Sequence, residues 1–192
     1  NPAIAAPNQG LGMAFWAMLS EHLYVVTGFS DANGDPTAAG FDTFFEDGEY
    51  FKHIELGFVS SFNRRYFDNI HLTAWHVDER NDANVPESWG IAFSASWFLE
   101  DKWMPFLRVG YSDGEAALMR TNVSLGIGRY FTENGNLLGL GFSWGKPSTD
   151  LLRSQVTTEI FYRVQVTRNV AITPDIQVIF APALNPTQSE II

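Results

Sequence analysis

The stretch Gln155-Val-Thr-Thr-Glu-Ile-Phe-Tyr-Arg-Val-Gln-Val-Thr167 alternates between apolar and polar side chains over its whole length. Val156 and Ile160 share one parity, whereas Glu159 and Arg163 share the other. Successive side chains of a β-strand point to opposite faces, so this period of two predicts a strand with one face in an apolar medium and the other in a polar one.

The same pattern recurs along the chain and predicts ten strands joined by short and longer connections in alternation. The expected strands are 11–18, 23–30, 51–62, 69–78, 89–98, 103–112, 120–131, 137–145, 155–167 and 170–180. The expected short connections are 19–22, 63–68, 99–102, 132–136 and 168–169, and the longer ones are 31–50, 79–88, 113–119 and 146–154. Short turns on one side and longer loops on the other are typical of an antiparallel transmembrane β-barrel, with its turns in the periplasm and its loops outside the cell.

Aromatic residues distinguish this barrel from a soluble β-sandwich, which would show the same alternation with its apolar face as the core. The rings of apolar parity at the long-loop ends of the strands are Trp89, Tyr111, Trp144 and Phe180. Those at the short-turn ends are Phe62, Trp97, Trp103 and Phe131. Two belts of rings about one strand-length apart are typical of the aromatic girdles of a membrane barrel.

The composition narrows the classes of function. The 192 residues include no Cys, which excludes disulfides and thiolate chemistry. Twelve basic and 22 acidic residues give a net charge of −10, which argues against a nucleic-acid partner. The mean hydropathy of −0.08 is too polar for a helical membrane protein. The first ten residues lack the basic start and apolar stretch of a secretion signal, so we expect a processed precursor or a missing N-terminal part.

Three segments resemble a known family. They are Tyr24-Val-Val-Thr-Gly-Phe-Ser-Asp-Ala-Asn-Gly-Asp-Pro-Thr37, Asp47-Gly-Glu-Tyr-Phe-Lys-His-Ile-Glu-Leu-Gly-Phe58 and Ile172-Thr-Pro-Asp-Ile-Gln-Val-Ile-Phe-Ala-Pro-Ala-Leu-Asn-Pro186. In this order they resemble the carbohydrate-selective porins of Gram-negative outer membranes, the OprB family. The resemblance implies a water-filled barrel of about sixteen strands. It also implies facilitated diffusion of mono- and oligosaccharides without a cofactor. The resemblance further implies a location in the lipid of the bacterial outer membrane, and it leaves open whether the protein is a homo-oligomer.

Ten strands are too few for such a barrel. We therefore expect residues 1–192 to form a single porin domain that is truncated at both ends and represents its C-terminal portion. The family has one more strand after the motif that ends at Asn185-Pro186, and the chain stops where that strand would begin. A fragment of this kind would leave edge strands unpaired.

Eight side chains of polar parity are the candidates for a sugar path through the pore. Carboxylates and guanidinium groups hydrogen-bond to hydroxyls, an aromatic face stacks on a pyranose, and charges of both signs set a transverse field. The alternative is that any wet barrel wall carries such residues, with a pair such as Glu159 and Arg163 neutralising each other. The candidates are Glu55, His71, Trp75, Arg108, Glu159, Arg163, Asp175 and Gln177.

Two patterns that point to catalysis are weak. Glu55 and Glu159 formally provide the two carboxylates of a glycosidase, but nothing in the sequence fixes their separation. The run Gly141-Phe-Ser143-Trp-Gly145 matches the nucleophile elbow of hydrolases, which requires a strand-to-helix turn. Lys146-Pro147 and a polar loop follow instead, so we reject this motif.

The loop after the second expected strand holds a partial calcium-binding pattern. Asp31, Asn33 and Asp35 have the spacing of the first EF-hand ligands, but Pro36 replaces the required Gly and Asp42 stands where the bidentate Glu belongs. A tight Asn-Gly turn explains these residues more simply. No metal site is therefore predicted.

Two further loop features remain, one with two possible arrangements and one with a single interpretation. Residues 41–50 form the most apolar long loop, which either makes a short helix at the barrel mouth or folds inward and narrows the pore. Arg64, Arg65 and Lys102 lie on or beside short turns and are interpreted as solvated rim charges.

Four alternative functions are considered for this sequence. The first is a passive sugar-selective porin without catalysis, and the second is a general or ion-selective pore of the same architecture. The third is a soluble β-sandwich binding module, which predicts that Leu107, Val164 and Ile176 form an interior. The fourth, a barrel enzyme, lacks a convincing set of nucleophile, base and orienting residue.

Overall fold

The computed structural model describes residues 1–37, 42–131 and 135–191. In this part of the chain nearly all regular structure is β-strand, with one short helix, α1 (Asp42–Glu46), and one 3-10 turn, η1 (Phe62–Arg64). The strands are β1 (Gly12–Met18), β2 (Leu23–Asp31), β3 (Tyr50–Val59), β4 (Asn69–Val77), β5 (Ser88–Ser96), β6 (Trp103–Asp113), β7 (Met119–Phe131), β8 (Asn136–Pro147), β9 (Gln155–Thr167), β10 (Val170–Ile172), β11 (Asp175–Phe180) and β12 (Glu190–Ile191).

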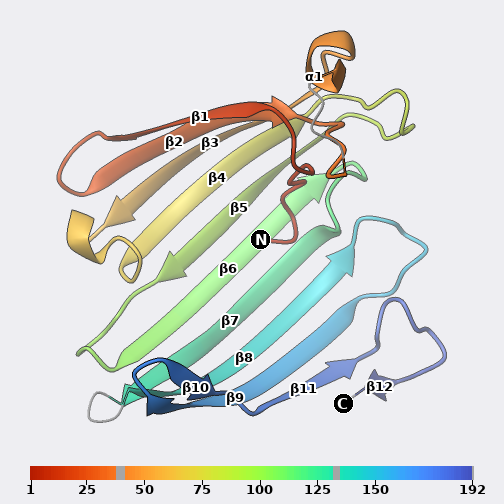
Figure 1. Ribbon diagram of the computed structural model, residues 1–192. Coiled ribbons are helices and arrows are strands. Elements are labelled where there is room, and N and C mark those ends of the chain that lie inside the picture. Colours follow the sequence, from red (N-terminus) through yellow and green to blue (C-terminus); the bar gives the residue numbers. More distant parts are fainter. Residues whose placement is uncertain (38–41, 132–134, 192) are drawn as a thin grey trace.

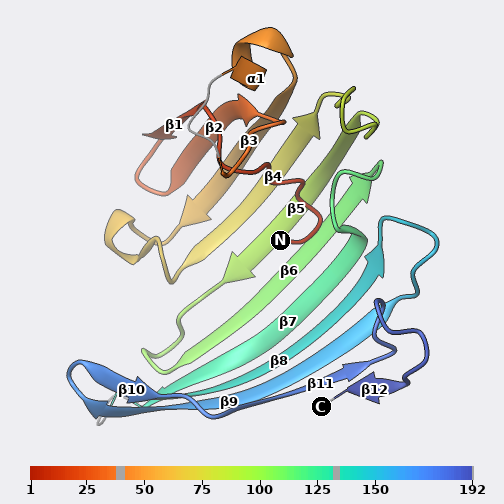
Figure 2. The same ribbon diagram turned by 45° about the vertical axis from the view of Figure 1, so that its right-hand side comes forward.

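All the strands belong to one antiparallel sheet in which chain neighbours pair with each other. The order is β1-β2-β3-β4-β5-β6-β7-β8-β9-β11-β12, and β10 pairs with β9 beside this path. The sheet curves into a trough, and the first ten residues lie on its concave side (Figures 1 and 2). Within the described residues β1 and β12 each pair along one edge only, so the sheet is an open part of a barrel. This confirms the predicted antiparallel barrel fold in its partial form.

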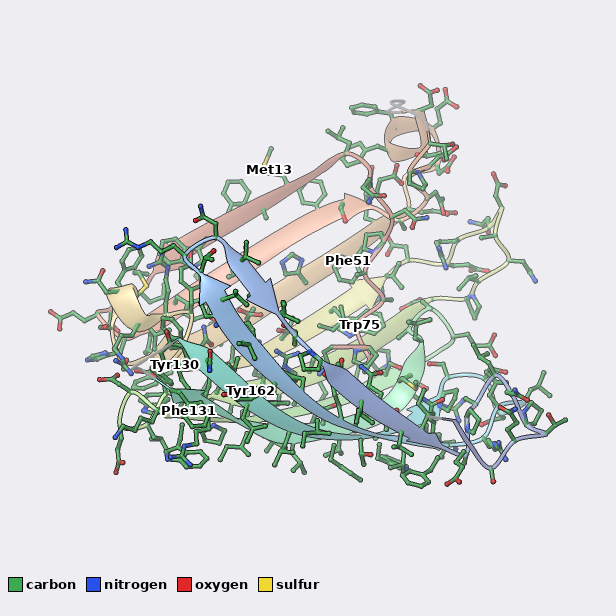
Figure 3. The ribbon with its side chains drawn as sticks, turned by 60° about the horizontal axis from the view of Figure 1, so that its bottom comes forward. Met13, Phe51, Trp75, Tyr130, Phe131 and Tyr162 are labelled. Atoms are coloured by element: carbon green, nitrogen blue, oxygen red, sulfur yellow. The ribbon has the colours of Figure 1, made fainter. Side chains whose placement is uncertain are left out.

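The register confirms the predicted parity of the side chains. Trp16 stands opposite Val26, Val26 opposite Glu55, and Glu55 opposite Thr73, so one row of side chains crosses four strands on the same face. This is the concave face, because Phe51 and Trp75 share its parity and lie inside the trough, whereas Met13 projects away from it (Figure 3). The residues of polar parity therefore line the inside of the curve.

The convex face is apolar and exposed. Leu107 and Ile176, which a soluble sandwich would bury, are 38% and 59% exposed. A continuous apolar surface of this kind is rare on soluble monomers and suits contact with lipid. The other exposed aliphatic side chains of the same parity in the middle of the sheet include Leu56, Leu72, Ile91, Leu125, Leu140 and Ile160.

Aromatic pairs stand near both edges of the convex face. At the long-loop edge the Trp89 and Tyr111 ring centroids are 6.0 Å apart. At the short-turn edge those of Phe131 and Tyr162 are 6.3 Å apart. The amphipathic rings of Tyr and Trp suit the boundary between lipid and water.

One ring of the predicted short-turn belt lies elsewhere. The predicted strand 51–62 ends at Val59, and Phe62 belongs to η1. Its ring centroid is 5.9 Å from that of Trp16, whose side chain has concave parity, so Phe62 faces the trough instead of the lipid side. Because β3 ends early, the connection 60–68 is longer than predicted, although it remains shorter than its neighbours 32–49 and 78–87. The alternation of short and long connections fails instead at 97–102 and 114–118, where the expected short connection is the longer of the two.

The predicted strand 170–180 is interrupted. β10 and β11 are separated by Thr173 and Pro174, and β11 rather than β10 continues the main sheet. Pro has no N–H to donate to a β ladder, which explains the break. The Pro174 carbonyl still accepts a hydrogen bond from the Tyr162 N–H at 3.1 Å.

The apolar loop 41–50 forms α1 at the mouth of the trough, above β2 (Figure 1). The Phe44 ring packs on Phe29 and Tyr50, at centroid distances of 6.1 and 5.1 Å, and the Phe44 carbonyl accepts a hydrogen bond from the Tyr50 hydroxyl. Both partners have convex parity, so the loop forms a short helix at the mouth and does not fold inward. Phe41, the first residue of the predicted loop 41–50, lies outside the described residues. No helix in the described ranges has the length and apolar character needed to cross a membrane.

Candidate functional site

The eight predicted site residues all lie on the concave face. His71 and Trp75 stand opposite Gly57 and His53 on β3, and Arg108 stands between Ser94 and Ser124. On the other side of the trough, Glu159 stands between Gly141 and Gln177. The set therefore forms two groups: Glu55, His71, Trp75 and Arg108 on β3, β4 and β6, and Glu159, Arg163, Asp175 and Gln177 on β9 and β11.

Glu55 is the centre of a hydrogen-bonded network in the first group. Its Oε1 accepts from the Tyr24 hydroxyl and its Oε2 from the Thr73 hydroxyl, both at 2.8 Å. His71 Nε2 lies 3.8 Å from the same Oε2, and His71 Nδ1 lies 2.8 Å from Asn69 Oδ1. Because these contacts come from the two strands on either side of β3, the carboxylate is held in a fixed orientation towards the inside of the trough.

Trp75 has the predicted parity, but its ring is not accessible to solvent. It is only 3% exposed, because the segment Asn1–Gly10 covers it, and its Nε1–H donates to the Ala3 carbonyl at 2.9 Å. Its ring also stacks on Phe51, with centroids 6.1 Å apart. In this structure Trp75 anchors a segment that lies on the concave face.

Arg108 contrasts with Trp75, because it lies exposed on the concave face. Its guanidinium carbon is 5.7 Å from the Phe106 ring centroid. Because its neighbours on both sides are small serines, the guanidinium group is accessible to solvent and solute.

The second group is less tightly connected. Asp175 and Gln177 are exposed, and Glu159 is half-buried. Within the described residues no salt bridge joins Glu159 to Arg163, whose Nε is buried without a hydrogen-bond partner. The expected alternative of a neutralising pair is therefore not what the structure shows.

Four aromatic rings on the concave face lie over glycines directly opposite them on neighbouring strands, a relationship that the sequence reading missed. A methyl group on the glycine would approach each ring to within 2.1–2.6 Å. Aromatic rings of this kind cover the bare backbone of a glycine in a sheet. The pairs are Tyr24–Gly57, Trp75–Gly90, Phe106–Gly126 and Phe161–Gly139.

The N-terminal segment is the second feature that the sequence did not reveal. Ala3 and Ala5 are both buried, and Ala5 belongs to one apolar cluster with Phe51, Trp75 and Ala117 of the long-loop connection 114–118. The Pro2 carbonyl also accepts from the Met119 N–H at 3.1 Å. The segment therefore occupies part of the trough near its long-loop end.

The arrangement does not support catalysis by the two glutamates. Glu55 is on β3 and Glu159 on β9, six strand spacings apart in the sheet. At about 4.8 Å for each spacing they are roughly 29 Å apart along the sheet. Glycosidase carboxylates stand within about 10 Å of each other. Ser143 lies inside β8, far from any strand-to-helix turn, and hydrogen-bonds with Ser124 at 2.8 Å.

The acidic residues of the long loop support its fold. Asp31 accepts from the Asn33 N–H at 2.8 Å and from Thr43, and Glu49 accepts from the side-chain amides of Asn33 and Asn81. Burial raises the pKa of Glu49, but these hydrogen bonds outweigh it and hold the pKa below its usual value. Among the described residues no cluster of three His, Asp or Glu side chains is arranged to hold a metal ion.

No curated protein matches the chain. A solved structure, the high-pH structure of Pseudomonas putida OprB, has a similar fold, with a TM-score of 0.71 and 13% sequence identity. The match covers 93% of this chain and 56% of that one, so the chain spans little more than half of the solved porin.

The sequence itself identifies the family. The model of the carbohydrate-selective porin, OprB family, matches residues 53–191, which include both groups of predicted site residues. The curved antiparallel sheet agrees with this match in fold. The chain therefore belongs to the OprB family of carbohydrate-selective porins.

Proposed function

We propose that this chain forms part of the wall of a water-filled pore in the bacterial outer membrane, through which carbohydrates cross by facilitated diffusion. The observation that carries the proposal is the division of one curved sheet into a polar concave face and an exposed apolar convex face. The convex face suits contact with lipid, and the concave face suits contact with water and solute.

The concave wall has the chemistry that hydroxyl-rich solutes need. Selectivity in a wide pore depends on its diameter and on the hydrogen-bond donors and acceptors that line it. Glu55 and Glu159 provide acceptors, Arg108 and Arg163 provide donors, and Gln177 provides both. The sugar passes without a covalent step, so the proposal involves neither catalysis nor a cofactor.

The proposal places the chain in a larger barrel. The open edges at β1 and β12 would pair with further strands, and the solved porin is longer than this chain. Such closure removes the unpaired edges that would otherwise be costly within a membrane.

The test uses the complete porin that contains this sequence, reconstituted into a planar lipid bilayer. We expect discrete channels whose current falls when glucose, maltose or longer maltose-type sugars are added at millimolar concentration. Channels that conduct ions but ignore every sugar would instead support a general or ion-selective pore. Correctly folded protein that forms no channels would contradict both pore functions.

A further inference from the structure

The concave face carries a further feature at its short-turn end, which adjoins Glu55 of the first group of site residues and lies apart from the N-terminal segment. A cavity of about 530 Å³ lies between β1–β4 and the connection 60–68. Its apolar lining includes Met18, Val26 and Val59. Ligand pockets usually measure roughly 300–1,000 Å³, so the space is sufficient for a small ligand.

Three aromatic rings line this cavity. Trp16, on β1, and Phe62, in η1, have ring centroids 5.9 Å apart, and Tyr66 follows in the same connection. All three rings are exposed, unlike Trp75 at the other end of the trough. A ligand that enters the cavity would therefore meet aromatic surface.

Arg65 holds two of these rings in place. Its guanidinium carbon lies 4.0 Å from the Phe62 ring centroid and 4.3 Å from that of Tyr66. Its Nη1 donates to the Phe62 carbonyl at 2.6 Å and its Nη2 to the Tyr66 hydroxyl at 3.0 Å. Because these contacts already fix the two side chains, less conformational entropy is lost when a ligand binds.

The same cavity reaches the polar network around Glu55. Tyr24, Glu55 and Asn69 all line it, and the Tyr24 hydroxyl lies 2.8 Å from Glu55 Oε1 and 3.2 Å from Asn69 Oδ1. A carboxylate has about four acceptor positions. Glu55 uses two of these for Tyr24 and Thr73, which leaves capacity for ligand hydroxyls. The negative charge of Glu55 and the positive charge of Arg65 balance within the cavity.

We propose that this cavity is a subsite for a neutral pyranose unit, with Trp16 and Tyr66 as stacking surfaces and Glu55 as an acceptor for its hydroxyls. A pyranose presents apolar C–H faces and a rim of hydroxyls, which is the chemistry that aromatic walls and a preorganised carboxylate accommodate. Balanced charge favours an uncharged sugar over a sugar acid or phosphate. The inference rests on the proposed function, and it places a binding position at the short-turn end, which faces the periplasm in outer-membrane barrels.

The test compares sugar block of the complete porin with that of Trp16→Ala, Trp16→Phe and Tyr66→Ala in planar bilayers. We expect Trp16→Ala and Tyr66→Ala each to raise the half-blocking glucose or maltose concentration by about fivefold, within the range of one aromatic contact. Trp16→Phe keeps a ring and should remain near the parent value. Trp89→Ala, on the convex face, is the matched control and should leave sugar block unchanged.

The outcomes separate this inference from the proposed function. If sugar blocks the parent and blocks both alanine variants equally well, the subsite is wrong and the sugar pore stands. If the parent does not respond to sugar, the proposed function fails and the subsite with it. If Trp16→Ala does not fold, Tyr66→Ala decides alone, because Tyr66 is an exposed residue of a connection outside the strands.

Discussion

The ring of Tyr24 lies directly over Gly57, its partner on the adjacent strand: a methyl group at Gly57 would stand 2.1 Å from Tyr24 Cζ. From this position the Tyr24 hydroxyl reaches Glu55 Oε1 at 2.8 Å. The absence of a side chain at one residue therefore fixes the orientation of a carboxylate two positions away on the same strand. This makes Gly57 a positioning residue for the polar network of the wall.

The first prediction is that Gly57→Ala displaces the Tyr24 ring and breaks its hydrogen bond to Glu55. Forcing a methyl group into a filled space usually costs about 1–3 kcal/mol, so we expect a loss of this size in the free energy of unfolding. Urea unfolding of the complete porin in lipid vesicles, followed by tryptophan fluorescence, measures it. Gly128→Ala is the control, since its methyl would meet Leu137 Cδ1 at an ordinary 3.4 Å. Equal losses in both variants would contradict the explanation.

The second prediction concerns Asp68 in the connection between β3 and β4. Its buried carboxylate accepts from Arg64 Nε at 2.5 Å, the Ser60 hydroxyl at 2.6 Å and the Phe98 N–H at 2.8 Å. Asp68→Asn should lower the free energy of unfolding by roughly 2–3 kcal/mol, because hydrogen bonds to charged groups contribute this much. Asp101→Asn is the control: Asp101 also binds Arg64, but its side chain is 74% exposed, so we expect a loss below about 1 kcal/mol.

The pH dependence of the Asp68 effect has a definite sign. Burial raises the pKa of Asp68, but the hydrogen bonds from Arg64, Ser60 and Phe98 outweigh it and keep the pKa below the ordinary value of 3.8. A lowered folded-state pKa stabilises the protein fully above 3.8, and the contribution is lost as the pH falls through the folded-state value. The difference between parent and Asp68→Asn should therefore be constant above about pH 5 and shrink below pH 4. A difference that persists unchanged at pH 3 would contradict the charged role of Asp68.

Local periodicity predicted most of the fold because a strand between lipid and water must alternate at every residue. The register that this implies placed all eight candidate residues on one face. The end of β3 was predicted three residues too late because Phe62 continues the alternation in sequence. In the structure the connection after β3 is tied through Asp68 to Phe98, 30 residues further along the chain.

The site was less predictable than the fold, because the surroundings of its residues depend on contacts with residues far away in the sequence. Trp75 has the parity of a pore-lining residue, but its surroundings are decided by Ala3, 72 residues away in sequence. Gly126 of β7 and Gly139 of β8 lie under rings that come from neighbouring strands, Phe106 of β6 and Phe161 of β9. Contacts of this kind depend on cross-strand register, which no single strand encodes.

The third prediction concerns the segment held by Trp75. Trp75→Phe keeps an aromatic ring but removes the N–H that donates to the Ala3 carbonyl, so residues 1–10 should open more often. We expect severalfold faster hydrogen exchange in the peptide that covers these residues, together with a higher single-channel conductance. Trp89→Phe, on the convex face, should change neither. Unchanged exchange in Trp75→Phe would show that apolar packing alone holds the segment.

The fourth prediction tests whether the concave face meets the ion path. Arg108 is exposed between two serines, so Arg108→Glu reverses a charge inside the trough and should raise the permeability of K⁺ relative to Cl⁻. The shift in reversal potential across a KCl gradient measures this change. It should be larger near 0.1 M than near 1 M salt, because the Debye length falls from about 10 Å to about 3 Å. Lys102→Glu makes the same reversal in the short turn before β6 and should have a weaker effect. Equal shifts for both variants would mean that Arg108 acts only through net charge and does not line the path.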